Sequence, residues 1–227
     1  ERLMVRAPNE PFTLYAHLAA FADVAPDNSS ITFYMNPKAR WADGKPVTAE
    51  DVEFTFETFK LKGLANQRML LKRIKDVKRI GLDGIQFTLN PLEDGAYDPE
   101  LPLVLGMLPV IPKHFFKGRE FDETTLDPLL GSGPYKIVEA SPPKKVVYER
   151  RPDYWAKDEP VSRGLYNMDR IEVTYYRDED VARMAFGAGE YDFKIEENPT
   201  KWKTGYKFKA VKDGRMKLVE LENNSSM

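Results

Sequence analysis

The chain has 227 residues, enough for one large domain or two small ones, and its composition is that of an ordinary globular protein. Its net charge of −2 argues against a nucleic-acid partner, because domains that bind nucleic acid usually carry a strong basic excess. It contains no cysteine, which excludes disulfides, thiol catalysis and thiolate metal sites.

The first elements in chain order are extended. Residues 5–15 are punctuated by Pro8 and Pro11, which restrict the residues before them, so we expect extended or turn-like backbone there. Apolar residues then alternate with Thr32 and Tyr34 over residues 31–35, which predicts a half-buried strand.

Residues 41–52, W-A-D-G-K-P-V-T-A-E-D-V, predict a strand end, a tight turn and a helix start. Gly44 suits the turn because it takes a positive φ without a Cβ clash. Thr48 is the expected N-cap, and Asp51 lies three residues later, where a capping-box acid belongs. The helix is expected to end at Gly63. Its apolar stripe has the spacing of one helix face: Val52, Phe56 and Phe59.

The next segment predicts a short helix, a hairpin and another helix. Residues 67–75 have a helical apolar pattern. Residues 77–82 and 85–89 are expected to pair around Asp83-Gly84, because this dipeptide is a strong hairpin signal. Residues 101–110 are apolar and contain prolines, which favours a short buried helix.

The second half of the chain predicts mostly strands around one helix. Asp178 is the expected N-cap of that helix, and Gly189 suits its C-terminal end. Strands are expected at residues 135–139, 146–150, 170–176, 191–195 and 216–221. The fold class is therefore mixed α/β, or α+β.

Three longer motifs occur together in this chain. They are W-A-D-G-K-P-V-T-A-E-D-V at residues 41–52, G-S-G-P-Y-K-I at 131–137 followed by V-Y-E-R-R-P-D-Y-W at 147–155, and A-F-G-A-G-E-Y-D-F at 185–193. In order and approximate spacing they resemble the peptide/nickel family of bacterial extracellular solute-binding proteins. Members of that family are the capture components of ABC importers.

Two shorter segments are similar to the YejA-like branch of that family, which is associated with peptides and peptide-like compounds. They are E-P-F-T-L-Y at residues 10–15 and R-G-L-Y-N at residues 163–167. The resemblance implies a periplasmic protein that delivers a peptide-like ligand to an inner-membrane permease. It implies no cofactor.

The resemblance also implies a domain organisation. Residues 1–15 and 130–222 would form the core of lobe I of a type II periplasmic-binding-protein fold, and residues 16–129 an inserted subdomain. Residues 223–227 would begin the crossover to a second lobe, which is missing if the chain is a fragment, as the family's greater length suggests.

Candidate ligand contacts come from the same resemblance. Arg68 could hold a peptide carboxylate with its planar guanidinium. Leu70 and Leu71 stand where the YejA-like branch is expected to place tyrosines on a wall that faces the ligand. Three weaker candidates for that wall are Tyr15, Met107 and Gly133.

Two other classes of function stay open on the sequence. Carboxylate pairs such as Glu196/Glu197 allow a glycosidase-like hydrolase, although 36 acids make such pairs frequent by chance. A non-catalytic protein-interaction module is the other alternative. His17 and His114 have no partner at metal-ligand spacing, and we expect surface or packed histidines. The Gly131-Ser132-Gly133 segment lacks nucleophile and phosphate-loop signatures and is expected to be a backbone turn.

Overall fold

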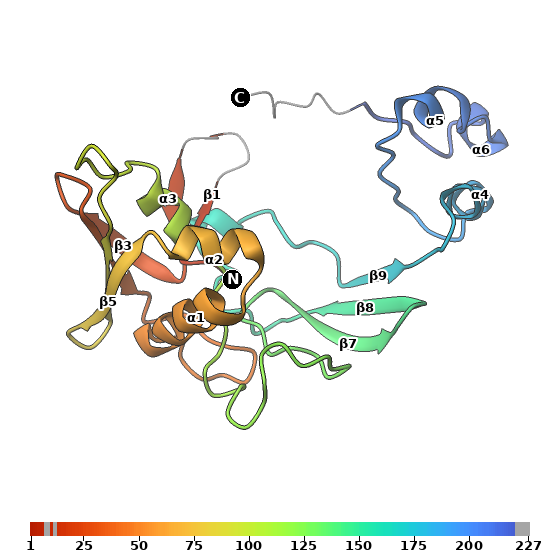
Figure 1. Ribbon diagram of the computed structural model, residues 1–227. Coiled ribbons are helices and arrows are strands. Elements are labelled where there is room, and N and C mark those ends of the chain that lie inside the picture. The colour runs from red at the N-terminus through yellow and green to blue at the C-terminus, as the bar shows by residue number, and fades with distance from the viewer. Residues whose placement is uncertain (7–9, 11–12, 221–227) are drawn as a thin grey trace. The chain divides into compact units, whose positions relative to one another are not determined.

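The computed structural model describes residues 1–6, 10 and 13–220. The chain divides into two compact units (Figure 1). Unit 1 comprises Glu1–Ser141 and Val146–Val173, and unit 2 comprises Pro142–Lys145 and Thr174–Met227. Helices and strands are mixed throughout, so the predicted mixed α/β fold class is confirmed. Among the described residues, no helix is both long enough and apolar enough to cross a membrane.

The centre of unit 1 is a four-stranded antiparallel sheet with the strand order β3-β4-β6-β5. Its strands are β3 (Ala19–Val24), β4 (Ser30–Met35), β6 (Gly84–Leu89) and β5 (Ile74–Ile80). In β4, the predicted alternation buries Ile31, Phe33 and Met35. Helix α1 (Ala49–Lys62) packs against β5 and β6, where the ring of Phe56 lies 5.8 Å from that of Phe87.

The corner before α1 forms as the sequence predicts. Gly44 has a φ of +85°, and Trp41 at the start of the turn is completely buried. Thr48 is the N-cap of α1, and its side chain and that of Asp51 form a complete capping box. Gly63 is the C-cap and donates its N–H to the carbonyl of Phe59. These local signals agree with one another, which is why this element was predictable.

Two boundaries after α1 differ from the prediction. Helix α2 spans Ala65–Leu71 instead of continuing to residue 75, because Ile74 already pairs with Leu89 in the sheet. The predicted hairpin is confirmed as β5 and β6, but its turn comprises residues 81–83. Gly81, with a φ of +61°, adopts the left-handed conformation there, and Gly84 begins the next strand.

The other elements of unit 1 are a pair of short strands, a short helix and a three-stranded sheet. Strands β1 (Met4–Arg6) and β2 (Leu14–Ala16) pair with each other, while Pro8 and Pro11 lie outside the described residues. The predicted helix at residues 101–110 is shorter: α3 spans Leu101–Gly106. A second sheet contains β7 (Tyr135–Ser141), β8 (Lys145–Arg150) and β9 (Arg170–Thr174) in that order. Strand β9 ends two residues earlier than predicted.

The described part of unit 2, which ends at residue 220, contains three helices: α4 (Glu179–Ala188), α5 (Pro199–Thr204) and α6 (Lys209–Lys212). The predicted caps of α4 are confirmed. The carboxylate of Asp178 accepts hydrogen bonds from two backbone N–H groups of the first turn, both at 2.9 Å. Gly189 ends the helix in the left-handed conformation, with a φ of +84°.

Two predicted strands in unit 2 are wrong. Residues 191–195 and 216–220 have no strand conformation, and Leu221 lies outside the described residues. Alternating residues are not sufficient for a strand, because a strand also needs a neighbour with which to hydrogen-bond. Tyr191 instead donates its hydroxyl to the carbonyl of Ala182 at 2.5 Å, whereas Phe193 and Ile195 are exposed.

Candidate ligand-binding groove

Unit 1 contains a groove with a volume of about 680 Å³. We call it the Tyr15 groove. Its walls come from the segment around β1 and β2, from Pro109 after α3, and from the loop that contains the short 3₁₀-helix η1 (Pro160–Ser162). Its lining residues are Glu1, Arg2, Val5, Arg6, Tyr15, His17, Pro109, Pro160, Val161, Ser162, Arg163, Leu165 and Tyr166.

Backbone pairing fixes the first wall. Val5 and Tyr15 are directly opposite each other in the antiparallel β1–β2 pair, so their side chains share one face. Arg2 forms an isolated bridge with Pro109, which connects this wall to the segment after α3. The hydroxyl of Tyr15 donates a hydrogen bond to Glu10, and this bond raises the pKa of Tyr15.

A polar cluster lies beside this wall. The carboxylate of Glu1 contacts His17 Nε2 at 3.2 Å and accepts a hydrogen bond from the hydroxyl of Tyr154 at 3.1 Å. The ring of His17 lies 5.0 Å from that of Trp155, whose indole N–H donates to the carbonyl of Ser132 at 3.0 Å. His17 is therefore a packed histidine, as one of the two sequence-based alternatives states. Its Nδ1 is buried without a hydrogen-bond partner among the described residues.

The cluster shifts two pKa values in opposite directions. Burial alone would raise the pKa of Glu1, but the hydrogen bond with His17, nearby positive charge and the Tyr154 hydroxyl lower it to about 2. Burial and the negative charge of Glu1 raise the pKa of Tyr154. Glu1 therefore stays ionised at neutral pH, with its oxygens already engaged by protein groups.

Two of the predicted contacts lie at or beside the groove. Tyr15 lines it. Gly133 adjoins Glu1 so closely that a Cβ at this position would lie 3.3 Å from the Glu1 carboxylate oxygen. Arg151, which is buried, donates to the carbonyl of Gly133 at 3.0 Å, and the backbone bends at Gly133 and Pro134 without forming the predicted turn at residues 131–133.

The other predicted contacts lie elsewhere in unit 1. Arg68 is exposed on α2 and donates a hydrogen bond at 2.7 Å to the carbonyl of Gly63, the C-cap of α1. Leu70 is partly buried against the core, and Leu71 is completely buried in it. Met107 is the half-buried C-cap of α3. The packing of Leu71 leaves no exposed surface for a ligand.

Sequence reasoning did not identify Arg2, Arg6, His17 or Tyr166 as groove residues. The groove combines three separate parts of the chain. Backbone pairing of β1 with β2 and of Arg2 with Pro109 brings the first two together, which short-range sequence patterns do not reveal. One signal was available, since Tyr166 falls within the R-G-L-Y-N segment that resembles the YejA-like branch.

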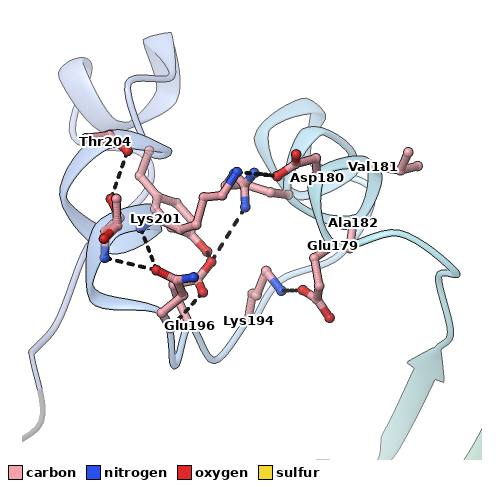
Figure 2. Close-up of polar contacts among 12 residues, drawn as sticks. Glu179, Asp180, Val181, Ala182, Lys194, Glu196, Lys201 and Thr204 are labelled. Carbon is pink, nitrogen blue, oxygen red and sulfur yellow. Dashed lines mark hydrogen bonds and ion pairs between the residues drawn. The ribbon is translucent and has the colours of Figure 1, made fainter.

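Unit 2 contains a separate polar cluster, which Figure 2 shows in close-up. Arg183, which is buried, pairs with Asp180 and lies 3.7 Å from Glu196. Lys201 Nζ reaches Asp180 at 2.9 Å, and the hydroxyl of Tyr206 donates to Glu196 at 2.9 Å. The charges in this cluster compensate one another, so the arrangement stabilises the packing of unit 2.

Three further acids have partners in the structure. Glu50 pairs with Lys113 at 2.6 Å, Asp51 belongs to the capping box and Asp178 is an N-cap. Each of these three carboxylates therefore has a protein partner. Within the described residues, no group of three His, Cys, Asp or Glu side chains could hold a metal ion.

Comparisons with known proteins agree with this architecture. The family model "Bacterial extracellular solute-binding proteins, family 5 Middle" matches residues 13–226. The chain is 40% identical over 231 residues to "Probable peptide-binding protein YejA" of Agrobacterium fabrum, with 98% of this chain and 37% of that protein covered. It is 38% identical over 222 residues to "Peptidoglycan-binding protein YepA" of the same organism, with 94% and 35% covered.

A solved structure supports the same fold. The ABC transporter substrate binding protein CtaP from Listeria monocytogenes superposes with a TM-score of 0.62 at 29% identity, over 78% of this chain and 35% of that one. The chain thus spans about a third of the length of the proteins that it matches. The match to the family model over nearly the whole chain shows that it belongs to family 5 of the bacterial extracellular solute-binding proteins.

Proposed function

We propose that this chain is part of the substrate-binding component of an ABC importer, which captures peptides or peptide-like compounds in the periplasm. The observation that carries the proposal is the 40% identity, over 98% of the chain, to a relative named as a peptide-binding protein. The relative named as peptidoglycan-binding supports the inclusion of peptide-like compounds.

The proposed mechanism is capture without bond breaking. This chain supplies one wall of the binding cleft, and a second lobe, in the part of the family's length that lies beyond this chain, supplies the other. The two lobes close around the ligand by a hinge motion, and the membrane permease recognises the closed form. The engagement of the acidic side chains in caps and ion pairs supports capture over hydrolysis.

Arg68 remains the proposed carboxylate-binding side chain on α2. In support, it pairs with no carboxylate in the described part of the chain, and only one hydrogen bond of its guanidinium, to Gly63, is formed. Replacement of Arg68 by Ala should weaken peptide binding by about 1.5–3 kcal/mol, the range for a hydrogen bond to a charged group. Arg68→Lys should restore only part of the affinity, because an ammonium lacks the planar fork.

The proposal as a whole is tested by titration of the chain with tripeptides, with a disaccharide and Ni²⁺ as comparison ligands. Chemical shifts should be followed to millimolar ligand, since one wall alone binds more weakly than a closed cleft. We expect saturable chemical-shift changes with the tripeptides and none with the disaccharide or Ni²⁺. Shifts with only the disaccharide or Ni²⁺, or release of cleaved products, would contradict it. The control variant Lys72→Ala removes an exposed cation at the C-cap of α2 and should bind like the unaltered chain.

A further inference from the structure

Three arginines that line the Tyr15 groove have no partner among the residues that the structure describes. Arg2, Arg6 and Arg163 are exposed, and none of them forms an ion pair or a side-chain hydrogen bond with the described residues. Other arginines in unit 1 differ in this respect: Arg73 pairs with Asp98, and Arg150 pairs with Asp169. The groove therefore concentrates guanidinium groups whose hydrogen-bonding capacity is unused.

The single acid that lines the groove does not cancel this charge. Glu1 is already engaged by His17 and Tyr154, and its low pKa keeps it as one fixed negative charge. Among the described residues, three guanidinium groups line the groove against the carboxylate of Glu1, and a second carboxylate, that of Glu10, contacts the hydroxyl of Tyr15, so an excess of positive charge is left. Such an excess in a concave site attracts anionic groups and raises their local concentration.

The rest of the lining suits the body of a small peptide. Apolar surface comes from Val5, Pro109, Pro160, Val161 and Leu165, and aromatic surface from Tyr15 and Tyr166. The volume of about 680 Å³ falls within the roughly 300–1,000 Å³ of small-ligand pockets. Arginine binds carboxylates bidentately, so these three side chains can hold more than one acidic group at once.

We propose that the Tyr15 groove selects acidic peptides, holding their side-chain carboxylates with Arg2, Arg6 and Arg163. This inference rests on the proposed function, peptide capture, and adds to it the class of peptide. The occupant is a peptide with at least two carboxylates, because charge complementarity to the three arginines requires several negative groups.

The test compares two peptides of nearly equal shape, Ala-Glu-Glu and Ala-Gln-Gln, both with free termini. Their affinities for the chain are measured by chemical-shift titration at low and at high salt. The acidic peptide should bind at least about tenfold more tightly, the equivalent of one charged hydrogen bond, and added salt should reduce this preference. Binding of both peptides with equal affinity overturns the groove proposal and leaves peptide capture standing, whereas binding of neither overturns both.

Matched variants locate the effect. Arg2→Gln, Arg6→Gln and Arg163→Gln should each weaken binding of Ala-Glu-Glu by about tenfold and leave Ala-Gln-Gln unchanged. Lys72→Gln removes the same charge from an exposed residue outside the groove, and it should change neither affinity. An equal loss of Ala-Glu-Glu affinity in Lys72→Gln would show that the preference depends on the net charge of the chain and not on the groove, and it would overturn the proposal.

The same variants also test whether a second copy of the chain, instead of a peptide, occupies the Tyr15 groove. If a second copy of the chain covered the groove, the arginine variants would shift the sedimentation of the chain from dimer to monomer and leave peptide affinity unchanged. That outcome also overturns the proposal. Because all three arginines are exposed, their single substitutions should leave the unfolding midpoint within the small range typical of surface sites.

Discussion

Replacement of Asp51 by Ala is expected to destabilise unit 1 strongly. The sequence assigns this carboxylate a capping role alone, but in the structure it connects three segments. Its Oδ2 accepts hydrogen bonds from the Thr48 N–H at 2.9 Å and from the Trp41 indole N–H at 3.3 Å. Its Oδ1 accepts one from the Lys113 N–H at 2.9 Å, far along the chain. Asp51 is 4% exposed and Trp41 is fully buried, so water cannot easily replace these bonds.

The magnitude follows from the donors that the substitution leaves unpaired. An unsatisfied buried donor costs about 1–3 kcal/mol, and water can reach part of the Thr48 and Lys113 backbone, so we expect a loss of about 3–4 kcal/mol. Thr48→Ala removes the capping hydroxyl together with a methyl group and should cost about 1 kcal/mol. Glu50→Ala, on the same helical turn, breaks an exposed ion pair with Lys113 and should cost under about 1 kcal/mol.

The assay is urea unfolding followed by fluorescence, with the free energy of unfolding obtained by linear extrapolation and the m-value compared among variants. The double variant Thr48→Ala/Asp51→Ala should lose less than the sum of the single losses, because the Thr48 hydroxyl donates a hydrogen bond to the Asp51 carboxylate. A loss for Asp51→Ala no larger than that for Glu50→Ala would refute this account of the corner.

Three further outcomes are expected. Gly44→Val should cost about 1–3 kcal/mol by backbone strain alone, because Gly44 has a φ of +85° and nothing lies within 4 Å of a Cβ built there. Gly44→Asn should be tolerated, and equal unfolding midpoints for the two variants would contradict this account. Gly187→Ala should cost about 1–3 kcal/mol by overpacking, because the new Cβ would lie 2.5 Å from the Phe208 ring, and Phe208→Leu should relieve part of that cost. Burial alone would raise the pKa of Glu196, but hydrogen bonds and nearby cations lower this pKa overall from 4.5. The ionised carboxylate therefore stabilises the fold above pH 4.5, and this stabilisation is lost as the pH falls through the pKa that Glu196 has in the folded protein. Glu196→Gln should flatten this acid-side dependence of unfolding, and an unchanged pH profile would argue against it.

The sequence predicts best where the determining contacts are local. The turn at Gly44, the capping box of Thr48 and Asp51, and the caps of α4 all depend on residues a few positions apart, and each forms as predicted. The boundary of α2 was wrong because the apolar spacing at Ile74 fits either a helix or a strand, and only its pairing with Leu89 decides between them.

The candidate site could not be predicted in the same way. Tyr15 was identified by resemblance, but the groove also needs Arg2 and Arg163, which tertiary packing alone brings to one surface. The failed strands at residues 191–195 and 216–220 have the same origin, because a strand depends on a partner that its own residues do not encode. Resemblance to known proteins identified the family from the sequence, whereas the residues that line the groove could be identified only from the folded structure.

Native mass spectrometry of the chain with Ala-Glu-Glu tests the central claim, peptide capture without chemistry, most directly. The account predicts a saturable one-to-one adduct whose added mass is that of the intact peptide, and a peptide of unchanged mass after release. An adduct that does not saturate, or a released peptide that has been cleaved, would contradict it.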